Sequence, residues 1–130
     1  MAKPIAERPV ILIVEDEPLV REMIVVELED AGFQVVQAES GEQALAALEQ
    51  EPRIDLVFTD IRLSGRLDGW DVAERARRRD EDVAVIYATG YSASEGRRVP
   101  GGLVLTKPYR AAAVLEAAET LGIKVPDARS

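Results

Sequence analysis

The sequence of 130 residues contains no cysteine and no histidine. Without cysteine the chain forms no disulfides or thiolate metal sites, and it has no thiol for catalysis. Without histidine it lacks an imidazole general base, the usual zinc ligand, and any residue that could carry a phosphohistidine. Chemistry on this chain must therefore rely on carboxylate, hydroxyl and ammonium groups.

Positive charge and long apolar segments are also scarce. The 24 acidic residues outnumber the 16 Lys and Arg and give a formal net charge of −8. This charge argues against nucleic-acid binding, because that function needs a basic surface. No apolar segment approaches the ~20 residues that span a bilayer, and residues 1–8 are polar and contain proline, unlike a signal peptide. We expect a cytoplasmic protein that binds neither nucleic acid nor membrane.

The apolar residues are arranged in short, largely β-branched runs that alternate with helical patterns. We predict strands at 10–14, 33–38, 54–59, 83–88 and 103–106. Helices are predicted from Pro18 to before Gly32, from Ser40 to before Pro52, over 69–79 and over 109–121, whereas glycine and proline leave 92–102 with at most a short helix. This alternation predicts one α/β domain at 9–122 between tails 1–8 and 123–130. Its core would be a doubly wound, flavodoxin-like parallel sheet of five strands in the order 2-1-3-4-5.

Several side chains indicate how the helices begin and pack. Pro18 suits a first helical turn, while Ser40 and Gln43 have the spacing of a capping box. Asp68 is expected to cap the helix 69–79, from which Trp70 packs against the sheet. The first helix is expected to bury the apolar residues that recur at helical spacing, namely Leu19, Met23, Val26 and Leu28.

Four of the predicted strands end in reactive polar groups. Glu15 and Asp16 follow the first strand, Asp60 the third, Thr89 the fourth and Lys107 the fifth. Because right-handed crossovers place the carboxyl ends of parallel strands at one edge, these groups converge around the crevice between the first and third strands. Carboxylates this close repel each other, and their hard oxygens suit Mg²⁺, which binds together with phosphate oxygens. Asp60 can act as a nucleophile without a base because a carboxylate is already ionised at neutral pH, so the pattern predicts a Mg²⁺ and phosphoryl site.

Other polar residues near this edge have simpler explanations. Glu17, the third consecutive acid, is expected in the first turn of the helix rather than in the metal site. Tyr91 could gate the site or form an edge of the core. Arg97 and Arg98, like the basic run 75–79, are expected on solvated surfaces, although the arginine pair could also contact an acidic partner.

The ordered motifs resemble those of the receiver domain of two-component response regulators, over about residues 9–122. The matching segments are Ile13-Val14-Glu15-Asp16-Glu17, Thr59-Asp60, Ala88-Thr89-Gly90 and Lys107-Pro108. This resemblance implies that Asp60 accepts a phosphoryl group from a histidine kinase or a histidine phosphotransfer protein. It also implies that Lys107 reaches the phosphoryl group and precedes a cis peptide bond, and that Thr89 swings toward the phosphoryl oxygen. The implied ligands of Mg²⁺ are Glu15, Asp16, Asp60 and the backbone carbonyl of Arg62.

The chain departs from the common receiver pattern at particular positions. Val104 stands where most receivers carry an aromatic switch residue, and a valine cannot report movement of Thr89 by rotating a ring. The segment Tyr87-Ala88-Thr89-Gly90-Tyr91 instead resembles the "FAT GUY" receivers of an alphaproteobacterial-type subgroup, which also lack that aromatic residue. Ser64 replaces the proline that is usual in the loop after Asp60. The resemblance therefore does not determine how the output switch works.

The resemblance implies a single-domain bacterial signalling protein rather than an enzyme, with catalysis limited to its own phosphorylation and dephosphorylation. It would pass phosphate on or bind a downstream protein, the latter through the surface formed by 92–102, strand 103–106 and helix 109–121. A receiver cut from a hybrid kinase would look the same, although the tails favour a complete protein. A pseudo-receiver that works without phosphate is the main alternative. A haloacid-dehalogenase-type phosphatase fits poorly, because that family carries an Asp-x-Asp-x-Thr motif where this chain has Glu15-Asp16-Glu17-Pro18-Leu19.

Overall fold

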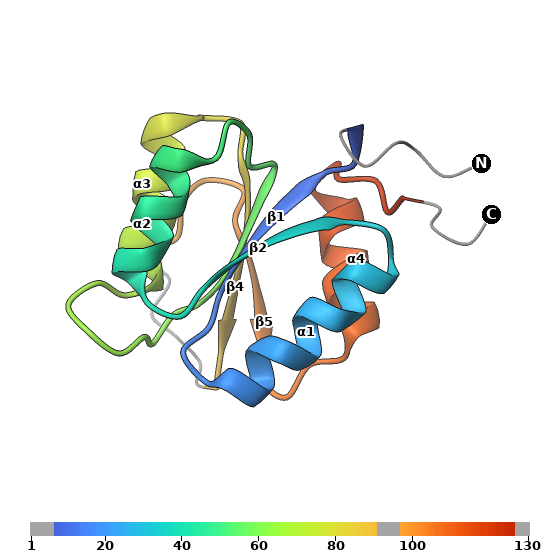
Figure 1. Ribbon diagram of the computed structural model, residues 1–130, viewed down its shortest axis with the longest axis horizontal. Helices are drawn as coiled ribbons and strands as arrows, with labels where there is room; N and C mark the ends of the chain where they lie inside the picture. Colours follow the sequence, from blue (N-terminus) through green and yellow to red (C-terminus); the bar gives the residue numbers. More distant parts are fainter. Residues whose placement is uncertain (1–6, 91–96, 127–130) are drawn as a thin grey trace.

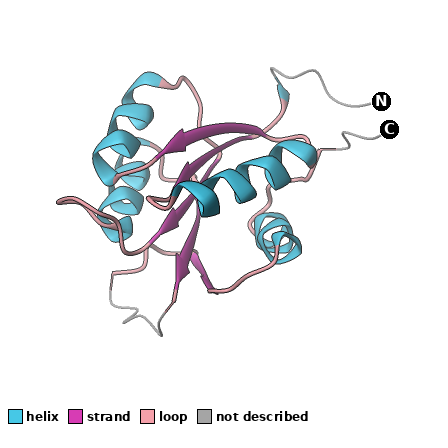
Figure 2. Ribbon diagram, turned by 60° about the horizontal axis from the view of Figure 1, so that its bottom comes forward, coloured by secondary structure: helices cyan, strands magenta, loops and turns pink. Residues whose placement is uncertain are grey.

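Five parallel strands form one sheet in the order β2-β1-β3-β4-β5, with helices on both of its faces (Figures 1 and 2). The computed structural model describes residues 7–90 and 97–126. The strands are β1 Val10–Val14, β2 Gln34–Ala38, β3 Leu56–Asp60, β4 Ala84–Thr89 and β5 Leu103–Thr106. The helices are α1 Pro18–Asp30, α2 Gly41–Gln50, α3 Gly69–Arg79 and α4 Ala111–Thr120. The predicted doubly wound fold and its strand order are confirmed.

Most element boundaries lie close to the predicted ones. Strands β1 and β5 and helix α3 have the predicted bounds, whereas β3 begins at Leu56 rather than at 54 and includes Asp60. Helix α4 begins at Ala111 rather than at 109, because Arg110 has extended backbone angles and serves as its N-cap. Of the weakly specified segment 92–102, residues 97–102 contain turns and no helix. Residues 91–96, and with them the two readings of Tyr91, lie outside the described part of the chain.

The sheet is buried on both faces, which explains the continuous apolar character of its central strands. All residues of β1, β3 and β4 are buried, as expected for parallel strands covered by helices. Alternate residues of each strand enter different cores, since successive side chains point to opposite faces. One core lies under α2 and α3, and the other under α1 and α4 (Figure 1). Because helices cover both faces of the sheet, polar groups of the central strands can reach solvent at the carboxyl ends of these strands.

Helix α1 buries a different stripe from the one predicted. Leu28 is buried as expected, but Leu19 is 76% exposed, Met23 70% and Val26 49%. The face against the sheet consists of Ile24, Val25 and Leu28. The prediction failed because α1 carries apolar residues on more than one stripe, so that helical spacing alone could not decide which stripe faces the sheet.

The helix starts follow the predicted capping chemistry, with one correction. The Ser40 hydroxyl accepts a hydrogen bond from the Gln43 backbone at 3.1 Å, but the Gln43 side chain accepts from Glu39 and not from Ser40. The predicted capping box at α2 is therefore only half formed. Asp68 does cap α3, in a complete capping box with Asp71. No helix in the described part of the chain is long and apolar enough to cross a membrane.

Candidate functional site

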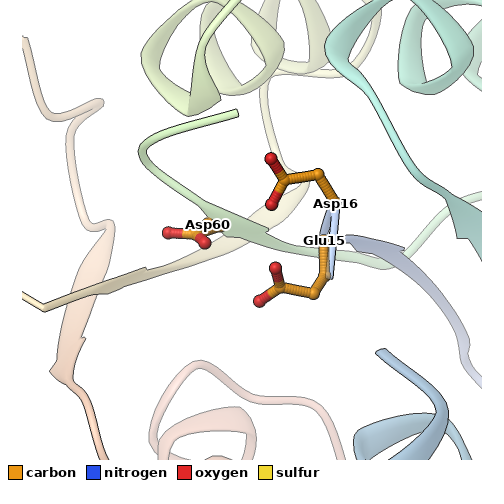
Figure 3. Close-up of side chains that lie close together, drawn as sticks. All are labelled: Glu15, Asp16 and Asp60. Carbon is orange, nitrogen blue, oxygen red and sulfur yellow. The ribbon is translucent and has the colours of Figure 1, made fainter. Parts of the chain in front are cut away.

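The carboxyl ends of β1 and β3 bring three acidic side chains together. Carboxylate oxygens of Glu15, Asp16 and Asp60 all lie within 4.8 Å of one another. Figure 3 shows Glu15 and Asp16 pointing to opposite sides of the end of β1, with both carboxylates turned toward Asp60. Glu15 and Asp60 are buried, being only 4% and 9% exposed. This convergence of the two strand ends is the one predicted from the sequence.

Lys107 supplies the positive charge beside these acids. Its Nζ donates to Asp60 Oδ2 at 2.8 Å and to Glu15 Oε1 at 3.3 Å. The Lys107 backbone also donates to the Thr89 carbonyl at 2.7 Å, which joins the ends of β4 and β5. The peptide bond to Pro108 is cis. Burial alone would lower the pKa of Lys107, but the hydrogen bond and charge of Asp60, reinforced by Glu15, raise it, so that the ammonium stays charged.

The electrostatics of the site leave excess negative charge. Burial raises the pKa of Glu15 above its ordinary value, and the charge of Asp60 raises it further. A hydrogen bond from the Glu17 backbone N–H, at 3.1 Å, and the nearby Lys107 ammonium act in the opposite direction. Among the contacts that the structure describes, Glu15 and Asp60 share the Lys107 ammonium, and the hard oxygens of the three carboxylates form a donor set that suits Mg²⁺. The side chains present therefore fit a divalent cation.

Asp16 is held by the loop that follows Asp60. The Ser64 backbone N–H donates to Asp16 Oδ2 at 3.0 Å, and the Arg66 N–H donates to the Glu42 carboxylate at 3.3 Å. The loop thus connects the end of β1 with the start of α2. Sequence reasoning noted Ser64 only as a departure from the receiver pattern and could not have predicted a backbone donor to Asp16.

The remaining predicted residues occupy distinct positions around the site. Thr89 ends β4 with its side chain buried, next to the strand that carries Asp60. Glu17 is the N-cap of α1, one position before the predicted first turn, and lies outside the group formed by Glu15 and Asp16 with Asp60.

Gly69 is a site residue that the sequence analysis missed. It is the first residue of α3, and its N–H donates to the Ile61 carbonyl at 2.8 Å. A Cβ added at this position would lie 2.2 Å from the Asp60 carbonyl oxygen and 2.8 Å from the Ile61 Cα. Helix α3 therefore begins in direct contact with the backbone of Asp60. The only sequence signal was a glycine directly after the capping Asp68.

Tyr109 lies beside Glu15 and Asp60 and contacts Phe58. Its ring packs edge-on against Phe58, with centroids 5.4 Å apart. Burial, followed by the negative charge of Glu15, raises the pKa of Tyr109 to about 12. The phenol therefore stays neutral at physiological pH and does not add to the charge of the site.

A groove of about 630 Å³ opens beside Lys107, between α1 and the start of α4. Its walls are mostly apolar and include Met23 and Ile24 of α1 together with Pro108 and Tyr109. The exposed side chains of Leu19 and Val26 lie on the same helix. An apolar surface thus borders the acidic centre.

The family model of the response regulator receiver domain matches residues 11–119. The chain belongs to this family. It is 34% identical over 105 residues to the response regulator receiver protein CpdR of Brucella abortus, covering 76% of this chain and 84% of that protein. It is 39% identical over 114 residues to a positive alginate biosynthesis regulatory protein of Pseudomonas aeruginosa. This match covers 82% of the present chain but only 44% of the longer relative.

Solved receiver structures share the fold at high coverage. A response regulator receiver protein from Sinorhizobium medicae superposes with a TM-score of 0.85 at 36% identity, covering 89% of this chain and 95% of that one. The response regulator TrrA from Thermotoga maritima, solved in complex with Mg²⁺-BeF, superposes with a TM-score of 0.78 at 31% identity. The match covers 87% of this chain and 98% of that one. The present chain is thus a receiver domain of a two-component response regulator, a signalling module rather than an enzyme of metabolism.

Proposed function

We propose that Asp60 accepts a phosphoryl group from a histidine kinase or a histidine phosphotransfer protein in a Mg²⁺-dependent reaction. The chain, with 9–122 as its receiver domain, then signals by binding a downstream protein or by passing the phosphoryl group on. This proposal rests on the position of the Asp60 carboxylate. It accepts a hydrogen bond from Lys107 at 2.8 Å, and its oxygen lies within 4.8 Å of carboxylate oxygens of Glu15 and Asp16. An unassisted carboxylate beside a fixed ammonium is a competent nucleophile for phosphoryl transfer.

The chain's own residues would divide the work of this transfer. An Asp60 carboxylate oxygen forms the new O–P bond while the N–P bond to the donor histidine breaks, so the electron pair leaves with the imidazole. Lys107 neutralises charge on the transferred phosphoryl oxygens, and the Thr89 hydroxyl donates a hydrogen bond to one of them. Where the phosphoryl group is not passed on, water attacks the phosphorus, the O–P bond to Asp60 breaks, and inorganic phosphate is released while the Asp60 carboxylate is restored.

Mg²⁺ would be held by Glu15, Asp16 and Asp60, with the backbone carbonyl of Arg62 as the fourth protein ligand. When bound, the ion neutralises negative charge on the phosphoryl group during transfer. The three carboxylates within 4.8 Å of one another support this assignment. The carbonyl of Arg62 stays a prediction from the family resemblance.

The partners would meet the chain at two different surfaces. A donor must bring its phosphohistidine to Asp60, and the groove between α1 and the start of α4 borders Lys107 and includes the exposed side chain of Met23 in its wall. We assign the donor to this surface, where an apolar helix face could pack. The downstream protein is assigned to the surface of 97–102, β5 and α4.

The proposed function is tested by following backbone amide resonances while Mg²⁺ and beryllofluoride are added. When beryllofluoride is added to the Mg²⁺-saturated protein, the wild type should show saturable shifts at Glu15, Asp60 and Lys107, and Asp60→Asn should show no further shift at that step. Asp82→Asn is the matched control, because Asp82 is an exposed acid just before β4, at the opposite edge of the sheet. Equal shifts in the Asp60 variant, or no shift in the wild type, would refute phosphoryl acceptance and favour a pseudo-receiver.

A further inference from the structure

The segment 97–102, which leads into β5, is bound to α3 through Arg97. The guanidinium donates from Nη2 to Asp71 Oδ1 at 2.9 Å and to Glu74 Oε1 at 2.9 Å, and from Nε to Glu74 Oε2 at 3.3 Å. Asp68 Oδ2 lies 3.7 Å from Nη1. Arg97 is the exposed loop residue that the sequence predicted, and its guanidinium is bound by acidic side chains of α3.

A second attachment joins the same segment to β4. The Val99 backbone N–H donates to the Tyr87 hydroxyl at 3.0 Å, and this bond is buried. Tyr87 is completely buried, and its ring packs against Trp70 with centroids 4.7 Å apart. At Gly102 an added Cβ would lie 3.1 Å from the Tyr87 ring, so the segment lies directly over this side chain.

Both attachments end on residues that support the acidic centre. Asp68 and Asp71 form the capping box of α3, and Gly69 between them contacts the Asp60 carbonyl. Tyr87 precedes Thr89 by two positions in β4, so the two side chains share one face of the sheet. A displacement at Asp60 or at Thr89 would therefore reach both attachments.

We propose that Tyr87 and Arg97 form a latch that holds residues 97–102 against β4 and α3 while Asp60 is unphosphorylated. A phosphoryl group on Asp60 opens this latch. This inference rests on the proposed function. Val104 has no ring that could act as an output switch, but Tyr87, its partner in the neighbouring strand, is aromatic. We therefore assign the output switch to Tyr87.

The strength of the attachments suits a reversible latch. If the Thr89 hydroxyl moves toward β3 to bond a phosphoryl oxygen on Asp60, as the family resemblance implies, the Tyr87 hydroxyl would move with the strand relative to Val99. The Arg97 ion pairs are partly exposed, with the arginine side chain 46% exposed, and such pairs contribute little stability. Opening the latch would free a surface that adjoins β5, where we place the downstream protein.

The latch is tested with two variants that act on its two ends. Tyr87→Phe removes only the hydroxyl that accepts from Val99, and Arg97→Gln removes the ion pairs from a partly exposed position where folding should be unaffected. Each variant should bind beryllofluoride with Mg²⁺ about threefold to fivefold more tightly than the wild type, since one hydrogen-bonded contact no longer opposes the switch. Arg78→Gln, which removes an exposed arginine of α3, should match the wild type.

The readouts separate failure of the latch from failure of the proposed function. Beryllofluoride binding is followed at the Lys107 amide, and latch opening at the Val99 amide, which should shift in the wild type in parallel with Lys107. If Lys107 responds while Val99 does not, or if Arg97→Gln binds no more tightly than Arg78→Gln, the latch is wrong and phosphoryl acceptance stands. If Lys107 does not respond in the wild type, the proposed function fails and the latch falls with it.

Discussion

Replacing Gly69 by alanine tests whether α3 and the acceptor backbone are as closely packed as the structure shows. The added Cβ would lie 2.2 Å from the Asp60 oxygen and 3.0 Å from its carbonyl carbon. A carbon and an oxygen that are not bonded to each other normally approach no closer than about 3.3 Å, so α3 or Asp60 must shift by about 1 Å. Such overpacking costs roughly 1–3 kcal/mol, and the higher helix propensity of alanine returns at most about 1 kcal/mol.

With that full return, the expected net loss is about 0–2 kcal/mol in the free energy of unfolding, measured by urea denaturation. A shift of about 1 Å at a reacting group can also cost up to ~100-fold in rate, so phosphorylation of Gly69→Ala by acetyl phosphate should slow at least tenfold. Gly90→Ala is the stability control, because an added Cβ there meets nothing within 4 Å. Wild-type stability and an unchanged phosphorylation rate in Gly69→Ala would refute the close contact.

Three further predictions concern the charges of the site. Because the pKa of Glu15 is raised in the folded protein, its ionised form opposes folding, and its contribution to the stability of the metal-free protein should fall as pH rises from about 4.5. In urea titrations between about pH 4 and 8, the stability of the wild type relative to Glu15→Gln should therefore fall as pH rises, and the same pH dependence in both proteins would contradict the prediction. Mg²⁺ should raise the melting temperature of the wild type and of Glu22→Gln, in which an exposed acid is changed as a control. The melting temperature of Asp16→Asn should rise much less, and an equal rise would show that Asp16 is not a Mg²⁺ ligand. Lys107→Gln should lose about 1–3 kcal/mol of stability without Mg²⁺, because the Asp60 and Glu15 carboxylates lose their shared cation; unchanged unfolding would show that the contact is weak.

The sequence predicted the sheet and the convergence of the acids, because both follow from strand ends. A buried parallel strand has a recognisable apolar run, and the residue after it must lie at the open edge. For this reason Glu15, Asp16, Asp60, Thr89 and Lys107 could be placed together without knowledge of any side-chain contact.

Features that depend on the direction in which a helix packs could not be predicted. Leu19 and Met23 have the same spacing as buried residues, yet the sheet selects the neighbouring stripe of α1. Arg97 is separated from Glu74 by 23 positions, so no local pattern links them. Likewise, Gly69 is recognisable as a helix start, but its contact with Asp60 depends on how the loop 61–68 folds back.

The central claim is tested most directly by locating the phosphoryl group itself. Protein incubated with Mg²⁺ and acetyl phosphate should gain the mass of one phosphoryl group, and peptide mass spectrometry after reductive trapping should place it on Asp60. Asp60→Asn should gain none under the same conditions, while Asp82→Asn should match the wild type. A wild type that stays unmodified, or that carries the group on another residue, would contradict the account.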